Sequence, residues 1–270
     1  TIRMQRRIFG GDLEVKNFIQ TNLVSMTDEK IDLLKHFFDG VGVSIDLFGD
    51  LRVNLAGVVR QRAVLENMDR LTRAGVDFGC IVVLSGANQH KLPQIFEFFA
   101  RMNLSFRVLP LFAGAGAGQH GEWDIGAKET KVALENLADL WFANESKIDV
   151  EPISSHLKDV LRHRAPVDTS HYYDRRAGES IIIVSTDGET YSLADAYKPG
   201  ASWGNIFTQP YAELVRSEGH ERSIVRTEQR MANSCTRCEY FGACSGYPVG
   251  EDNHAYSELS SDGGECPVIR

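Results

Sequence analysis

Four of the five cysteines in this 270-residue chain lie near one another in its C-terminal part. They are Cys235, Cys238, Cys244 and Cys266, in the pattern C-x2-C-x5-C-x21-C. Two cysteines three residues apart on a tight turn can place both sulfurs on one metal centre, and a more distant pair can complete a tetrahedral shell. The pattern therefore predicts one metal site.

The identity of the metal does not follow from the cysteine spacing. Spacing alone allows both zinc and an iron–sulfur cluster, and by itself it favours structural Zn2+. The fifth cysteine, Cys80, lies among apolar residues in the segment 78–84. We expect it to be a buried structural thiol.

Composition and charge exclude several classes of function. The net charge is −8, which disfavours nucleic acid as a partner, because such binding needs clustered Lys and Arg. No apolar stretch is long enough to span a membrane, and no signal peptide opens the chain. We expect a cytoplasmic protein in a reducing compartment, where grouped cysteines indicate metal binding before disulfides.

The first part of the chain alternates strand-like and helix-like segments. Strands are predicted at 17–21, 41–46, 78–84 and 106–111. The helices expected between and after them cover residues 28–39, 57–73, 92–102, 128–142 and 154–164. This alternation predicts βαβ units and a parallel sheet, and hence an α/β fold.

The pattern changes near residue 166. Asp187-Gly188 between two β-rich runs predicts a β-hairpin over 180–191, and a helix follows at 211–217. We therefore expect a parallel α/β part at 1–120, a helical connector at 121–165 and a small α+β domain that carries the cysteines at 166–270.

Short motifs at the ends of the predicted strands resemble a known family. Thr21-Asn22 ends one strand, and Ser44-x-Asp46 ends the next; Arg52, Asn88 and Leu109-Pro110-Leu111 follow at family-like intervals. In this order they resemble the radical S-adenosylmethionine (SAM) enzymes with a C-terminal SPASM domain, which include peptide maturases and anaerobic sulfatase-maturing enzymes. The resemblance implies a partial (β/α) barrel followed by a small iron–sulfur domain.

The C-terminal region resembles the SPASM segment from its hairpin onward, through 187–191, 204–206 and C-x2-C-x5-C. Fuller versions of that domain carry two auxiliary clusters. Here the ligands of one set are complete, while the positions of the other set, near 176–178, 191–193 and 244–248, lack the matching cysteines. The resemblance therefore implies one auxiliary [4Fe–4S] cluster and reverses the preference for zinc.

The C-x3-C-x2-C motif that holds the SAM-binding cluster in this family does not occur in the sequence, nor do the first two barrel strands. We expect this portion, with a second cluster, in a longer protein. The alternative is a degenerate relative that binds without chemistry.

The resemblance implies roles for particular residues. Asn22, Ser44 and Arg52 would contact SAM, with the Arg52 guanidinium on the SAM carboxylate. Their ordinary alternatives are a turn former, a strand-end hydroxyl and a surface arginine. Leu111 would pack near adenine or in the core, and Asp195 would accept a proton. Asp46 is expected to cap the strand or pair with Arg52.

The resemblance also implies a reaction and its partners. A radical derived from SAM would abstract hydrogen from a ribosomally made peptide or protein, which is then cross-linked or oxidised, with electrons from a flavodoxin or ferredoxin. The segment 171–173 and Trp203 would offer either an aromatic contact surface or core packing. The acidic balance would suit a substrate with basic residues. A non-catalytic peptide-binding module and a zinc-ribbon protein are the competing hypotheses.

Overall fold

The computed structural model describes most of the chain in ten segments. These are residues 2–9, 13–48, 52–53, 55–111, 123–144, 148–165, 174, 176, 181–193 and 198–246. The chain forms two compact units. The first comprises Thr1–Leu111 and Ala133–Ile153, and the second comprises Phe112–Val132 and Ser154–Arg270. The predicted three-part division stays a prediction.

The first unit is built on a five-stranded sheet with the order β1-β2-β3-β4-β5, in which every neighbouring pair is parallel. The strands are β1 (Phe18–Thr21), β2 (Gly40–Ser44), β3 (Phe78–Leu84), β4 (Phe106–Pro110) and β5 (Val150–Glu151). The prediction of a parallel α/β fold is therefore confirmed. The short β5 was not predicted.

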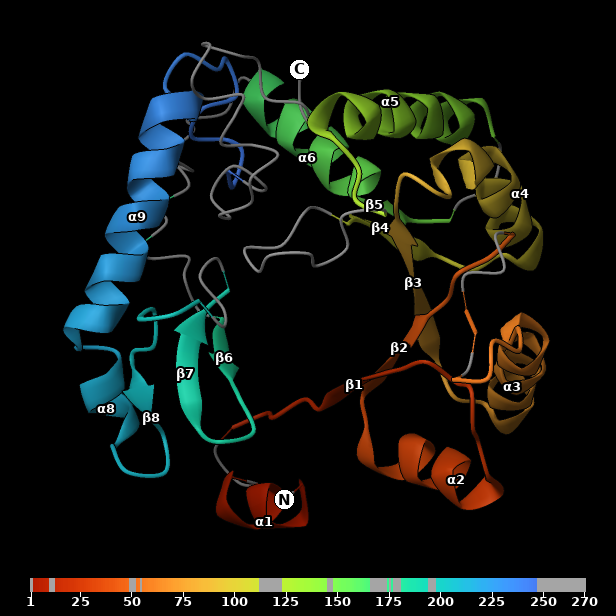
Figure 1. Ribbon diagram of the computed structural model, residues 1–270, viewed down its shortest axis with the longest axis horizontal. Helices are drawn as coiled ribbons and strands as arrows, with labels where there is room; N and C mark the ends of the chain where they lie inside the picture. Colours follow the sequence, from red (N-terminus) through yellow and green to blue (C-terminus); the bar gives the residue numbers. More distant parts are fainter. Residues whose placement is uncertain are drawn as a thin grey trace. The chain divides into compact units, whose positions relative to one another are not determined.

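Helices connect the strands, as parallel pairing requires. They are α2 (Asp28–Phe37), α3 (Gln61–Ala74), α4 (Leu92–Met102), which follows the 3-10 turn η1 (Gln89–Lys91), and α5 (Ala127–Ala143); α1 (Ile2–Phe9) precedes the sheet. Helices α2, α3 and α4 lie on one side of the sheet (Figure 1). The Thr27 side chain caps α2 by accepting from the Lys30 N–H, as the sequence indicated.

The start of α3 differs from the prediction. We expected a helix from residue 57, but α3 begins at Gln61. Gly57 has φ +75°, outside the helical region, and Val53 and Val59 form an antiparallel bridge before the helix. The helical spacing of Val64, Met68 and Leu71 holds within α3, but it does not extend back to Gly57, where β-branched valines favour the extended pairing that the structure shows.

The core of the first unit lies between the sheet and its helices. Alternate strand residues such as Val43, Val82 and Val108 are at most 1% exposed. Leu71 from α3 and Phe99 from α4 are fully buried as well. The residues between these on each strand point to the other face of the sheet, because the side-chain period of a strand is two.

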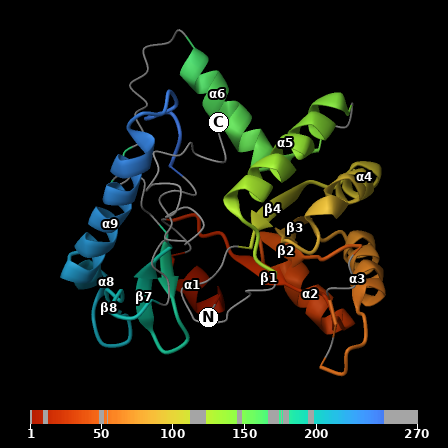
Figure 2. The same ribbon diagram turned by 45° about the horizontal axis from the view of Figure 1, so that its top comes forward.

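The second unit contains an antiparallel sheet of β6 (Ile182–Val184), β7 (Glu189–Ser192) and β8 (Gly204–Asn205). The predicted Asp187-Gly188 hairpin is confirmed, with Gly188 at φ +90°. The helices are α6 (Ile153–Arg164), α8 (Tyr211–Leu214) and α9 (Glu218–Cys235), and α9 packs against β7 (Figure 2). No helix in the described part of the chain is long and apolar enough to cross a bilayer.

Helix α9 was not predicted, although its start carries a sequence signal. Ser217 caps the helix by accepting from the N–H of His220 at 3.1 Å, and Glu218 and Glu221 lie in the first turn. An N-cap serine followed by acidic residues is a helix-start pattern. This helix matters because its last residue is the first of the grouped cysteines, Cys235.

Cys80 lies in β3 and is 2% exposed, so the prediction of a buried structural thiol is confirmed. Burial raises the pKa of the Cys80 thiol to about 12, because the apolar surroundings disfavour the thiolate.

We expect Cys80 to resist alkylation in the native protein. At about pH 8, a pKa near 12 leaves about a thousandfold less thiolate than the ordinary value of 9.0. Iodoacetamide labelling followed by peptide mass spectrometry should therefore leave Cys80 unmodified in buffer and modify it in concentrated urea. Rapid labelling of Cys80 in buffer, with the protein still folded, would contradict its placement in the core.

Candidate active site and cysteine loop

The ends of the parallel strands place the predicted site residues along one edge of the first sheet. Strands β1, β2, β3 and β4 end at Thr21, Ser44, Leu84 and Pro110. Parallel pairing brings all carboxyl ends to the same edge, which is where ligands bind in open α/β sheets. Asn22, Ser44, Arg52 and Leu111, far apart in the sequence, therefore belong to one edge.

Ser44 is held by a neighbour that the sequence reading did not single out. The Nε2 atom of Gln20 donates to the Oγ of Ser44 at 2.7 Å. Gln20 pairs in register with Gly42, two residues before Ser44, so both side chains project from the same face. The two-residue alternation of β1 and β2 was the signal that could have found this contact.

Arg52 and Asp46 form the main ion pair at this edge. Arg52 Nε and Nη2 both donate to Asp46 Oδ2, at 3.1 and 2.6 Å. The two side chains are 16% and 19% exposed, so the pair is largely shielded from solvent. The expectation that Asp46 partners Arg52 is confirmed. The pair does not use Arg52 Nη1, so the planar guanidinium can orient a second acceptor.

Asn22 acts as a turn former in this structure. Its Oδ1 accepts from the N–H of Val24 at 3.2 Å. Leu23 is fully buried at φ +51°, and its carbonyl accepts from Asn67 Nδ2 at 2.7 Å. The Asn67 Oδ1 in turn accepts from Arg70. Helix α3 thus fixes the loop that presents Asn22, and the SAM contact of Asn22 stays a prediction.

The end of β3 is closed by Asn88. This buried side chain accepts from the N–H of Ser85 and donates to the carbonyl of Val83, both at 2.8 Å. The N–H of Leu111 donates to the carbonyl of Leu84 at 2.7 Å, which extends the β3–β4 pairing to the edge. The backbone next to Leu111 is therefore well fixed.

Three of the four predicted metal ligands lie in the described residues, on the loop after α9. The N–H of Cys238 donates to the carbonyl of Cys235, and the N–H of Cys244 to that of Tyr240. The N–H of Gly246 donates to Cys244 Sγ at 3.3 Å. Cys266 lies outside the described residues. Within the described part, no three His, Cys, Asp or Glu side chains are grouped as a metal site.

The cysteine loop is contacted by α6, which lies about 80 residues earlier in the chain. Arg162 Nη1 donates to the carbonyl of Ala243 at 3.3 Å. The rings of His163 and Tyr240 meet edge to face with centroids 5.0 Å apart. No local pattern predicts these contacts, because they depend on how α6 packs in the second unit.

Arg176 makes ionic contacts with helix α9. Arg176 Nε and Nη2 donate to the two carboxylate oxygens of Glu228, at 2.6 and 2.9 Å, and Nη1 donates to Glu221. These two carboxylates raise the pKa of Arg176 above its ordinary value. Both glutamates belong to α9, so ionic contacts fasten this segment to the helix that carries Cys235.

Two further predictions concern the second unit. Trp203 is 4% exposed, and its ring meets that of His220 edge to face. Core packing therefore accounts for Trp203, and the idea of an aromatic contact surface loses this member. Asp195 and residues 171–173 lie outside the described residues.

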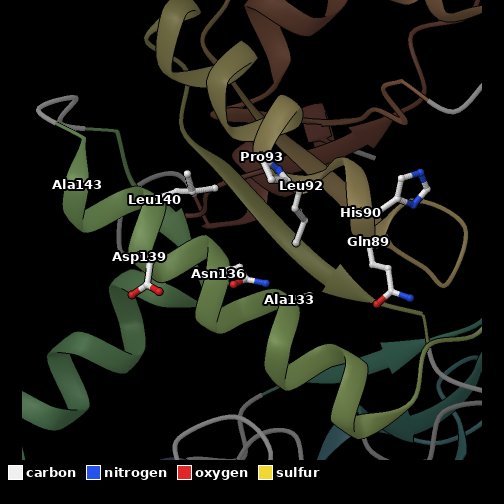
Figure 3. Close-up of a pocket in the computed structure, with 9 residues that line it drawn as sticks. All are labelled: Gln89, His90, Leu92, Pro93, Ala133, Asn136, Asp139, Leu140 and Ala143. Atoms are coloured by element: carbon white, nitrogen blue, oxygen red, sulfur yellow. The ribbon is translucent and has the colours of Figure 1, made fainter.

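A separate hollow of about 540 Å3 lies between η1, α4 and α5 (Figure 3). Its walls are largely apolar, with Leu92 and Pro93 on one side and Leu140 on the other. None of the predicted site residues lines it.

Comparison with known proteins supports the family resemblance. No protein-family model matches the sequence. The chain is 22% identical over 253 residues to the serine-type anaerobic sulfatase-maturating enzyme of Bacteroides thetaiotaomicron, covering 86% of this chain and 60% of that enzyme.

Solved structures show the same arrangement of elements. Native anSMEcpe with bound AdoMet and the Cp18Cys peptide superposes with a TM-score of 0.72 at 19% identity, over 97% of this chain and 76% of that one. SuiB from Streptococcus suis gives a TM-score of 0.61 at 12% identity, over 90% and 60%. The chain has the radical SAM maturase fold. The predicted resemblance is thereby confirmed, and the site at the strand ends belongs to a fold that binds AdoMet in anSMEcpe.

The radical SAM fold is represented here in part. The chain spans 60% of the length of the Bacteroides enzyme. The activity, substrate and partners of the complete protein are therefore matters for proposal.

Asn67 should be needed for stability. Asn67→Ala removes the donor to the Leu23 carbonyl and the acceptor of Arg70, inside a buried network. An unsatisfied buried polar group costs about 1–3 kcal/mol, and urea unfolding should show a loss of that size. Asn136→Ala, on an exposed face of α5, should change stability by less than about 0.5 kcal/mol. Equal effects of the two substitutions would contradict the bracing of this loop by α3.

Proposed function

We propose that this chain is part of a radical SAM enzyme that modifies a peptide or protein. The reaction would abstract hydrogen from a side-chain or backbone carbon, and the substrate would then be cross-linked or oxidised. The observation that carries the proposal is the Asp46–Arg52 pair beside Ser44, at the carboxyl edge of a sheet whose fold binds AdoMet in anSMEcpe.

The residues at this edge suit the amino-acid end of SAM. The guanidinium of Arg52 is oriented by Asp46 and can bind the SAM carboxylate with its remaining N–H groups. Ser44 offers a hydroxyl, fixed by Gln20, for the ribose or amino group. Asn22 would supply a further polar contact, and Leu111 would pack near adenine. SAM, with a reducing [4Fe–4S] cluster, supplies a radical that abstracts hydrogen.

The cysteine loop suits an iron–sulfur cluster by the chemistry of its donors. Cys235, Cys238 and Cys244 are free thiols on successive tight turns, and an N–H···S bond already forms at Cys244. Backbone hydrogen bonds to ligand sulfurs tune such clusters. With Cys266 as the fourth ligand, the protein would fill all four positions of one cubane. Electron transfer or structural support would then remain as its roles.

The substrate and the partners follow from the proteins that share the fold. Solved anSMEcpe structures contain the Cp18Cys and Kp18Cys peptides, which supports a peptide or protein substrate here. A flavodoxin or ferredoxin would supply electrons. Asp195 would be the proton acceptor. We place the protein in the cytoplasm, because reduced thiols and reduced clusters require a reducing compartment.

Reconstitution under anaerobic conditions tests the clusters. The complete protein should bind about eight iron and eight sulfide, four of each per cluster. Cys244→Ser should lose about four of each, because one ligand of the auxiliary cluster is removed, whereas Cys80→Ser should keep all eight. Iron and acid-labile sulfide analysis measures this. Stoichiometric zinc without iron would instead support a zinc-ribbon protein.

The affinity for SAM tests the proposed role of Arg52. Arg52→Lys should weaken SAM binding about ten- to a hundredfold, because an ammonium group cannot reproduce the planar fork of the guanidinium. Asp46→Asn should weaken SAM binding less, because it only loosens the orientation of Arg52.

Isothermal titration of the reconstituted protein is the measurement for both variants. Arg101→Lys, on the exposed face of α4, is the matched control and should bind SAM normally. An unchanged affinity of Arg52→Lys for SAM would contradict the proposed contact between Arg52 and SAM. If all variants bind SAM and none forms 5′-deoxyadenosine with a reductant, the protein is a binding module and not an enzyme.

A further inference from the structure

One methionine connects the end of α9 to the cysteine loop. Met231 lies four residues before Cys235, so the two side chains lie on the same side of this helix. Met231 is half-buried, as are Cys235 and Cys244. The helix therefore brings a thioether and a proposed cluster ligand to the same region of the second unit.

Gly246 lies directly against Met231. A Cβ built on Gly246 would be 2.5 Å from the methyl carbon of Met231 and 2.9 Å from its sulfur, closer than non-bonded atoms approach. Gly246 is buried and has φ +78°, in the left-handed region that favours glycine. A side chain at this position would therefore strain the backbone and displace Met231.

The same glycine also contacts the sulfur of Cys244. The N–H of Gly246 donates to Cys244 Sγ at 3.3 Å. Met231 thus packs on the residue whose backbone bonds to a proposed ligand sulfur. We call the Met231 side chain, with Gly246 and its N–H···S bond, the thioether cap.

The surroundings of the ligand sulfurs set the reduction potential of an iron–sulfur cluster. Reduction adds negative charge to a cluster that already carries thiolates, and water stabilises this charge better than an apolar side chain does. A hydrogen bond to a sulfur stabilises the charge as well. An apolar group that keeps water away from the sulfur therefore lowers the potential.

We propose that Met231 is a positioning residue for the auxiliary cluster. Its side chain covers Gly246 and Cys244, holds the N–H···S bond in place and excludes water from it. Methionine suits this place, because its apolar and unbranched side chain fills irregular gaps. The assignment rests on the proposed function, since it requires a cluster on Cys244, and it adds the residue that sets the potential of that cluster.

A redox titration of the complete, reconstituted protein, followed by electron paramagnetic resonance, tests this role. The signal of the auxiliary cluster is the one that Cys244→Ser lacks. Met231→Ala should raise the midpoint potential, because water reaches the sulfur of Cys244. At the wild-type midpoint, the ratio of reduced to oxidised auxiliary cluster should rise about tenfold, which corresponds to about 59 mV for a one-electron couple.

Three further variants separate the potential from packing. Met231→Leu keeps an apolar side chain of similar volume and should keep the wild-type potential. Met231→Gln keeps the length but adds a polar amide, so its potential should rise even where Met231→Ala loses its cluster. Met102→Ala, at an exposed methionine of α4, is the matched control and should not change the potential.

Iron analysis tests the contact between Met231 and Gly246. Gly246→Ala should lose auxiliary iron, because its methyl group meets Met231. The double variant Gly246→Ala/Met231→Ala has room for this methyl group while the strain at φ +78° remains. It should therefore bind at least about twofold more auxiliary iron than Gly246→Ala. Equal iron content in the two variants would overturn the contact.

The outcomes distinguish this inference from the proposed function. Zinc without iron in the wild-type protein would overturn the proposed function itself. Iron in the wild type, with an unchanged or lowered potential in Met231→Ala and Met231→Gln, would overturn only the role of Met231. Loss of auxiliary iron from every Met231 variant, Met231→Leu included, would also overturn it, because Met231 would then be needed to bind the cluster and not to shield it.

Discussion

Parallel hydrogen bonding between β1, β2, β3 and β4 is the constraint on which the site depends. It brings the carboxyl ends of four strands to one edge, although these ends are separated by about 20 to 40 residues of chain. The same register sets which side chains share a face. It therefore produces the Gln20–Ser44 contact at the edge, whereas the Asp46–Arg52 pair forms within the segment that follows β2.

The helices secure this edge from outside the sheet. Asn67 on α3 binds the carbonyl of Leu23, and Asn88 closes the end of β3 before α4 begins. Both are buried amides with their hydrogen bonds satisfied: Asn67 donates to a backbone carbonyl and accepts from the Arg70 side chain, and Asn88 pairs with backbone groups only. A site built in this way is preorganised before any ligand arrives, which is what positioning of a reactive radical requires.

Much of the fold could be predicted from the sequence, because the strands and helices of the first unit follow clear periodicities. The two-residue and 3.6-residue patterns located β1 to β4, α2 and α4, and Asp187-Gly188 located the hairpin. The predicted start of α3 was wrong because the apolar spacing of Val64, Met68 and Leu71 fixes the face of the helix but not its first residue. The two-residue alternation of β1 and β2 indicates the shared face of Gln20 and Ser44 but not the register that pairs them. The Arg162–Ala243 contact depends on helix packing, which no local pattern encodes.

Hydrogen–deuterium exchange of the complete, reconstituted protein with and without SAM tests the central claim most directly. SAM should slow exchange at least about tenfold in the backbone of residues 21–24 and 44–53, because bound ligand opposes opening of the strand ends. The exchange rates of peptides from α1 and from α4 should not change. Protection at the hollow between α4 and α5, with none at the strand ends, would contradict the placement of the site.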